Sequence, residues 1–153
     1  LKCCSGILFH HESKFRKNNY VIKKLVNGAL KIKKNQNKKI KKIKFGNINV
    51  MKDWGWAPEY VFIINKILIS NKIDDYIICS GVSKSLNSVI SHTFNSLKLN
   101  KKKYVTIDKD LKRRADIKIS KGDNNKLFKK LKIRPKNNIF NVIDKLIKKN
   151  FDG

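Results

Sequence analysis

Acidic residues and arginine are both scarce in this 153-residue sequence. It holds 11 Asp and Glu against 37 Lys and Arg, which gives a formal net charge of +26. Such a charge attracts polyanions, so nucleic acid or an anionic membrane has to be considered as a partner. Only four of the basic residues are arginine, which nucleic-acid readers favour, and the lysines are spread along the whole chain. We therefore favour a codon bias shared by Lys, Asn and Ile, and expect no specific nucleic-acid partner.

Cysteine, histidine and glycine are also few, and their positions exclude several kinds of site. Cys3, Cys4 and Cys79 are too few for a disulfide framework and have no CxxC spacing, so we expect a reduced, cytoplasmic setting. His10 and His11 have no partner at metal-ligand spacing, and we predict no metal site. The seven glycines never lie closer than nine positions apart, which excludes a GxGxxG fingerprint and a P-loop.

Long hydrophobic runs are absent. The most apolar segment, YVFIINKILIS (60–70), is short and interrupted by Asn65 and Lys66, so we expect no membrane partner. The chain is 41% hydrophobic, which suffices for the core of one domain. The sequence begins with Leu1 and not with Met, from which we expect that an N-terminal part is missing.

Apolar periodicity predicts short strands that alternate with amphipathic helices. The helix after Pro58 is expected to bury Val61, Ile64, Ile67 and Leu68. Strands are expected at 3–10 (buried), within 42–56, and at 75–81, 103–108 and 115–120. Further helices are expected at 20–32, 86–97, 124–131 and 139–149. The expected inner faces of the second and the last of these helices are made by Leu86, Val89, Ile90, Thr93, Phe94 and Leu97 in 86–97, and by Ile139, Val142, Ile143, Leu146 and Ile147 in 139–149. The mixture predicts an α/β or α+β fold.

Four blocks of the sequence resemble, in order, the signature blocks of one enzyme family. They are GILFHHESKFRKNNYVIKK (6–24), KDWGWAPEYV (52–61), DDYIICSGVSKS (74–85) and YVTIDKDLKRRADIKISKGD (104–123). They are similar to GILFNHESPxRGxxFVTRK, RDWGxAxDYV, DDYVIATGxxxS and YVxIDxxxxRPxEVDxLxGD of the GDP-mannose 4,6-dehydratases, members of the extended short-chain dehydrogenase/reductase family. The closing segment, 126–151, also agrees, so the resemblance covers essentially the whole chain.

The resemblance implies a fold and a place within it. Residues 1–153 look like the C-terminal part of an extended Rossmann-type NAD(P)-binding fold, with its smaller α/β substrate-binding lobe. In the family, the glycine fingerprint, the catalytic Thr and Glu, and the catalytic YxxxK helix all precede the GILF strand. The resemblance thus implies that the N-terminal cofactor-binding half is absent and that this chain holds no catalytic residue. Tyr20 and Lys24 match YxxxK in spacing, but they align with FVTRK instead.

For a complete enzyme, the resemblance implies conversion of GDP-mannose to GDP-4-dehydro-6-deoxymannose with loss of water, with NADP as cofactor and a homo-oligomeric assembly. His11 and Arg16 match family residues that help to bind NADP. His10 and Lys14 depart from the family, which has Asn and Pro at these places.

The remaining matched residues belong to the nucleotide-sugar site. Val21 and Lys24 match positions that line it, and Lys52, Arg113 and Asp116 match the residues that hold the diphosphate and the ribose hydroxyls. Lys52 replaces an Arg and loses bidentate phosphate geometry. Asp116 replaces a Glu and keeps a carboxylate acceptor with a shorter reach.

Three other interpretations stay open at this point. A related nucleotide-sugar dehydratase or epimerase would share the fold and the diphosphate contacts. A non-catalytic remnant would bind without turnover. A lysine-rich nucleic-acid-binding protein is the third, and dispersed lysines argue against it.

Overall fold

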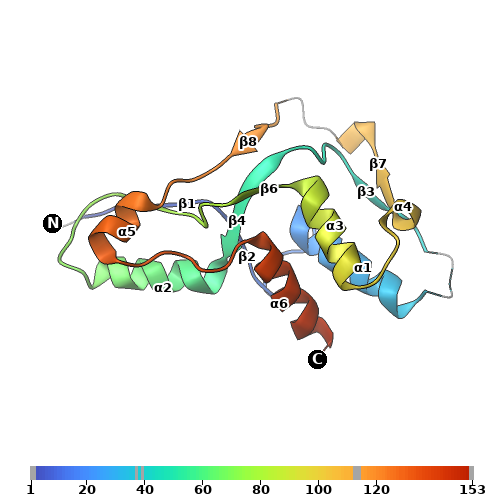
Figure 1. Ribbon diagram of the computed structural model, residues 1–153, viewed down its shortest axis with the longest axis horizontal. Coiled ribbons are helices and arrows are strands. Elements are labelled where there is room, and N and C mark those ends of the chain that lie inside the picture. The colour runs from blue at the N-terminus through green and yellow to red at the C-terminus, as the bar shows by residue number, and fades with distance from the viewer. Residues whose placement is uncertain (1–2, 37, 39, 112–114, 152–153) are drawn as a thin grey trace.

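The computed structural model describes residues 3–36, 38, 40–111 and 115–151, which form an α/β fold of short strands and helices (Figure 1). In chain order the elements are β1 (Gly6–Leu8), β2 (His10–Glu12), α1 (Val21–Lys34), β3 (Ile43–Phe45), β4 (Met51–Trp56), α2 (Ala57–Leu68), β5 (Tyr76–Ile78), β6 (Ser83–Ser85), α3 (Leu86–Ser96), α4 (Lys101–Tyr104), β7 (Val105–Ile107), a 3₁₀ turn (Lys109–Leu111), β8 (Ile119–Ser120), α5 (Asn125–Leu131) and α6 (Ile139–Phe151). The predicted α/β class is confirmed.

Most strand pairs are parallel. β1 pairs with β5, β2 with β4, and β3 with β7, all in parallel, whereas β6 runs antiparallel to β4. β8 pairs in parallel with the start of β4. Parallel pairs require crossover connections, and α1 lies in the one between β2 and β4. β4 thus stands at the centre of the molecule, between the helices at either end of Figure 1.

The larger of two hydrophobic clusters, here called the major core, joins α1, α3 and α6. Leu25, Phe94 and Ile143, one from each helix, are fully buried in it. The apolar faces predicted for 86–97 and 139–149 are the buried faces. Ser85 caps α3, because its Oγ accepts a hydrogen bond from the backbone N–H of Ser88 at 3.1 Å.

The smaller cluster, here called the minor core, joins α2, β5 and α5. Tyr60, Ile63 and Ile67 of α2 are buried in it, whereas Val61 and Leu68 are 65% and 70% exposed. The predicted buried face of α2 was therefore wrong at these last two positions. α2 is apolar around most of its circumference, so periodicity alone does not identify the side that faces the core.

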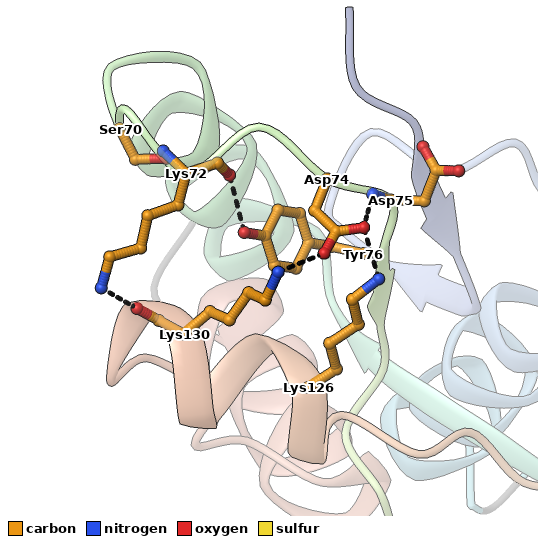
Figure 2. Close-up of polar contacts among 7 residues, drawn as sticks. All are labelled: Ser70, Lys72, Asp74, Asp75, Tyr76, Lys126 and Lys130. Carbon is orange, nitrogen blue, oxygen red and sulfur yellow. Dashed lines mark hydrogen bonds and ion pairs between the residues drawn. The ribbon is translucent and has the colours of Figure 1, made fainter.

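Polar contacts fasten α5 to the segment before β5 (Figure 2). The Asp74 carboxylate accepts hydrogen bonds from the ammonium groups of Lys126 and Lys130, which both rise from α5. Lys72 Nζ donates to the Lys130 carbonyl at 2.6 Å, and the Tyr76 hydroxyl donates to the Lys72 carbonyl at 2.7 Å. These bonds close the minor core on its solvent side.

The apolar run that contains β1 is not buried as predicted. β1 pairs with β5 alone among the described strands, and Ile7 and Leu8 are 54% and 41% exposed. The reason is geometric, since one edge of β1 has no neighbouring strand in the described part of the chain. The apolar character of the run fits a strand that is covered on both sides.

Candidate functional site: a basic cavity beside β2 and β4

A cavity of about 520 Å³ opens between β2, the start of α1 and β4. Its lining includes Arg16, Val21, Lys24, Lys52 and Asp116, five of the residues predicted to bind cofactor or substrate. They come from three separate stretches of the sequence, which the parallel pairing of β2 with β4 and the region before β8 bring together. Of the two other predicted residues, His11 does not line the cavity and Arg113 lies outside the described residues.

Arg16 is held on two sides. Its Cζ lies 3.6 Å from the centroid of the Tyr20 ring, and its Nε lies 3.8 Å from Oε2 of Glu12. Glu12 is only 3% exposed, and burial raises its pKa to about 7 although Arg16 and Lys23 oppose the rise. Both Glu12 Oε2 and Arg16 Nε are buried without a hydrogen-bond partner among the described residues. The cavity wall therefore contains a buried carboxyl group and a buried guanidinium nitrogen that lie 3.8 Å apart without a hydrogen bond between them.

A second part of the wall carries lysines from α1 and β3. Lys24 Nζ donates to the carbonyl of Lys44 at 2.7 Å, and Lys44 Nζ donates to Oδ2 of Asp108 at 3.0 Å. This last bond is the main cause that lowers the pKa of Asp108 below its ordinary value. Val21 is half-buried at the first position of α1 and gives the wall an apolar surface.

Lys52 and Asp116 form an ion pair in the wall of the cavity. Lys52 Nζ lies 3.7 Å from Oδ1 of Asp116, and their side chains are 18% and 20% exposed. His10 also lines the cavity, and its pKa is lowered first by burial and then by the charges of Lys52 and Arg16. The cavity is therefore electropositive and offers the Asp116 carboxylate to a ligand, which suits an anionic ligand with hydroxyl groups.

His11 lies on the other side of β2 from the cavity. Successive side chains of a strand point to opposite faces, so His10 and Glu12 line the cavity and His11 does not. Its ring lies 5.2 Å from the ring of Tyr60, and its Nδ1 lies 2.9 Å from the carbonyl oxygen of Phe9. Because a carbonyl only accepts, Nδ1 carries the hydrogen, which leaves Nε2 as an acceptor in the neutral ring.

Two carboxylates that the sequence reasoning did not select prove important. One is Glu12. The other is Asp53, which is fully buried and accepts hydrogen bonds from Ser80 N at 3.0 Å, Ser80 Oγ at 2.6 Å and Gly81 N at 2.8 Å. Asp53 belongs to the KDWG block, so the resemblance pointed to it, but its partners Ser80 and Gly81 lie in a different block.

Gly55 of the same block is required by packing. A Cβ at this position would lie 2.4 Å from Cε1 of Tyr60, closer than any real contact. Trp54 and Trp56 on either side are 3% and 8% exposed and belong to the major core. The DWGW segment is thus a structural junction beside the cavity, and Trp54 is its one member that also lines the cavity.

No group of three or more His, Cys, Asp and Glu side chains in the described residues could hold a metal ion. Among the helices of the described part of the chain, none is both long enough and apolar enough to cross a membrane.

Solved structures with the same fold define the class. RMD from Pseudomonas aeruginosa, solved with NADPH, superposes with a TM-score of 0.82 at 17% identity over 96% of this chain and 47% of its own. A dTDP-glucose 4,6-dehydratase from Bacillus anthracis, solved with NAD, gives a TM-score of 0.78 at 15% identity over 97% of this chain and 45% of its own. The fold is that of part of the Rossmann-type dehydratases and epimerases.

Sequence comparison defines the family within that class. The family model for GDP-mannose 4,6 dehydratase matches residues 1–146. GDP-mannose 4,6 dehydratase 1 of Arabidopsis thaliana is 35% identical over 136 residues, which cover 89% of this chain and 37% of that protein. The Dictyostelium discoideum dehydratase is 25% identical over 97% of this chain and 46% of its own length. The chain belongs to the GDP-mannose 4,6 dehydratase family, and it spans well under two thirds of these relatives.

Proposed function

We propose that the chain is the C-terminal part of a GDP-mannose 4,6-dehydratase, which converts GDP-mannose to GDP-4-dehydro-6-deoxymannose with loss of water. The observation that carries the proposal is the convergence of Arg16, Val21, Lys24, Lys52 and Asp116 on one cavity. Each of them matches a ligand-binding position of the family, and the cavity volume falls within the range of small-molecule sites.

The substrate residues have distinct proposed roles. Lys52 supplies a point charge for the diphosphate, and Asp116 accepts hydrogen bonds from the ribose hydroxyls. Since the two side chains pair with each other at 3.7 Å, a bound nucleotide replaces an existing ion pair and does not meet an unpaired charge. Val21 and Lys24 line the same site and are proposed to contact the same ligand. Arg113 is proposed to act with Lys52 on the diphosphate.

The proposed cofactor is NADP, and the proposal rests on Arg16 and His11. Arg16 carries a fixed positive charge in the wall of the cavity, which suits a phosphate group. Nε2 of His11, which is an acceptor in the neutral ring, suits an amide N–H. When bound, the nicotinamide would supply hydride-transfer chemistry at the sugar. This chain's residues bind and orient the two ligands, and none of them is proposed to transfer a proton.

We further propose that the cofactor-binding half is a separate or preceding segment, so that residues 1–153 alone are inactive. The exposed Ile7 and Leu8 of β1 support this, because the strands of a parallel sheet are normally covered on both faces. The proposed setting is the cytoplasm, which suits free cysteines. Homo-oligomerisation is proposed for the complete enzyme.

Calorimetry with GDP tests the cavity as a nucleotide-sugar site. In Lys52→Met, GDP binding should weaken by about 1.5–3 kcal/mol, the usual effect of removing a charged hydrogen-bond partner. Lys84→Met is the matched control, because Lys84 lies opposite Lys52 on β6 but does not line the cavity. Equal GDP affinity in the parent and in Lys52→Met would contradict the proposal.

The second test concerns the missing half. The 153-residue chain, incubated with GDP-mannose and NADP⁺, should form no 4-keto product. Turnover well above background would show that the catalytic groups lie within this chain.

A further inference from the structure

Glu12 occupies a position from which it can organise the loop at the mouth of the cavity. It is the last residue of β2, and its backbone is fixed by pairing with Trp56 of β4. Its side chain is 3% exposed and lies 3.8 Å from Nε of Arg16, a residue of the loop 13–20. A carboxylate is seldom buried to this degree unless a partner offsets the loss of hydration.

The loop above Glu12 is tied down by cations and amides. Arg16 approaches Glu12 through Nε at 3.8 Å, and Lys23 Nζ donates to the carbonyl of Lys14 at 3.0 Å. Further along, Asn27 Nδ2 donates to Oδ1 of Asn18 at 2.7 Å. The loop therefore has several anchors, but Glu12 is the one that contacts Arg16 from below.

The geometry of Arg16 leaves its guanidinium available to a ligand. Tyr20 covers one face of the guanidinium at 3.6 Å, and Glu12 lies beside Nε without accepting a hydrogen bond from it. An arginine that is free to rotate would lose side-chain entropy on binding an anion. An arginine that is already stacked and electrostatically held loses less, which is the benefit of preorganisation.

We propose that Glu12 is a positioning residue that holds Arg16 in the orientation in which it binds a phosphate group of the ligand. The assignment of that phosphate to a dinucleotide rests on the proposed function, whereas the action of Glu12 on Arg16 does not. Glu12 itself contacts no ligand. The role requires the negative charge of Glu12, which is present above its pKa of about 7, and Glu12→Gln removes this charge while keeping the shape of the side chain.

The first measurement needs no ligand. In the parent chain, above the Glu12 pKa of about 7, the Arg16 Nε–Hε group should show restricted motion in a ¹⁵N relaxation measurement, and in Glu12→Gln its motion should increase. Glu59→Gln is the matched control, because Glu59 binds Asn137 far from Arg16 along the chain. An Arg16 Nε–Hε group whose motion is equally restricted in the parent and in Glu12→Gln overturns the proposal.

The second measurement tests whether positioning affects binding, with inorganic pyrophosphate and NADP⁺ as probes. We expect Glu12→Gln to weaken binding about 5-fold and Arg16→Ala more strongly, and the double variant should be no weaker than Arg16→Ala. Additive losses overturn the proposal, because they place Glu12 outside the action of Arg16. If no form binds either probe while the motion of the Arg16 Nε–Hε group changes as expected, the proposed function fails and the contact between the two residues stands.

Discussion

The major and minor cores differ in how completely their apolar residues are covered. In the major core, the apolar faces of α3 and α6 are buried almost without exception. Around the minor core, three apolar side chains are more than half exposed, namely Phe62 and Leu68 of α2 and Ile7 of β1. In Figure 1, α2, α5 and β1 lie at the end of the molecule opposite α1, α3 and α4. The end with α1, α3 and α4 thus has its apolar residues buried, whereas the end with α2, α5 and β1 exposes apolar side chains to solvent.

This difference in burial shows which part of the chain is held together largely by polar contacts. The minor core has few buried residues, and its elements are joined by the bonds of Asp74 to α5 and of Glu59 to Asn137. Exposed apolar patches on a folded protein mark surfaces that pack against something else. The comparison therefore agrees with the proposal that a further part of a Rossmann sheet covers β1.

The largest expected effect comes from emptying the major core. Phe94→Ala should lower the free energy of unfolding by about 3–5 kcal/mol, because Phe94 is fully buried. Phe62→Ala, which truncates the same residue type where it is 55% exposed, should change it by about 0.5 kcal/mol or less. Urea denaturation followed by circular dichroism measures both. An equal loss in the two variants would show that α2 is covered in solution.

The next effect concerns the junction between the two cores. Asp53→Ala should cost about 2–4 kcal/mol, since it leaves two backbone N–H groups and a hydroxyl without their charged acceptor. Asp110→Ala, at an exposed carboxylate of the 3₁₀ turn, is the control and should be nearly neutral. Both are measured by the same denaturation. A mild effect at Asp53 would mean that water replaces its bonds.

Glu12 should make stability depend on pH. Its pKa is about 7 in the folded chain and 4.5 ordinarily, so the folded state binds the proton more tightly. The free energy of unfolding should therefore fall as pH rises from about 4.5 to about 7, by roughly 3 kcal/mol. Glu12→Gln should remove this slope. Thermal melts at pH 5 and pH 8 compare the two chains, and a slope that persists in Glu12→Gln would assign it to another group.

The smallest effect is expected at the solvent side of the minor core. Hydrogen bonds from Lys126 and Lys130 lower the pKa of Asp74, so its stabilising contribution is present above the ordinary value of 3.8 and is lost as pH falls below it. Asp74→Asn should lower the melting temperature slightly at pH 7 and low salt. The difference should shrink in high salt, because exposed ion pairs are screened. A difference that salt leaves unchanged would point to packing instead.

Sequence reasoning succeeded where a pattern had one interpretation. The inner faces of α3 and α6 were correct because these helices are clearly two-sided, whereas α2 is apolar nearly all round and its inner face was not. For the site, the resemblance selected Arg16, Lys52 and Asp116, which the structure brings to one cavity, although their roles stay predictions.

What sequence did not reveal depends on contacts between distant segments. Glu12 stands in a motif beside His11, yet only the pairing of β2 with β4 shows which of the two lines the cavity. The bonds of Asp53 to Ser80 and Gly81 span 27 and 28 positions. A linear pattern carries no information on such partners, because they are set by strand register and by the turn after β5.

The placement of Asp53 directly after Lys52 couples the two ends of the molecule mechanically. Lys52 lines the cavity, and one residue later Asp53 grips the turn that leads out of the minor core. The binding site and the packing interface therefore share adjacent residues of one strand. A substitution that loosens the turn after β5 is expected to change the position of the Lys52 ammonium group as well.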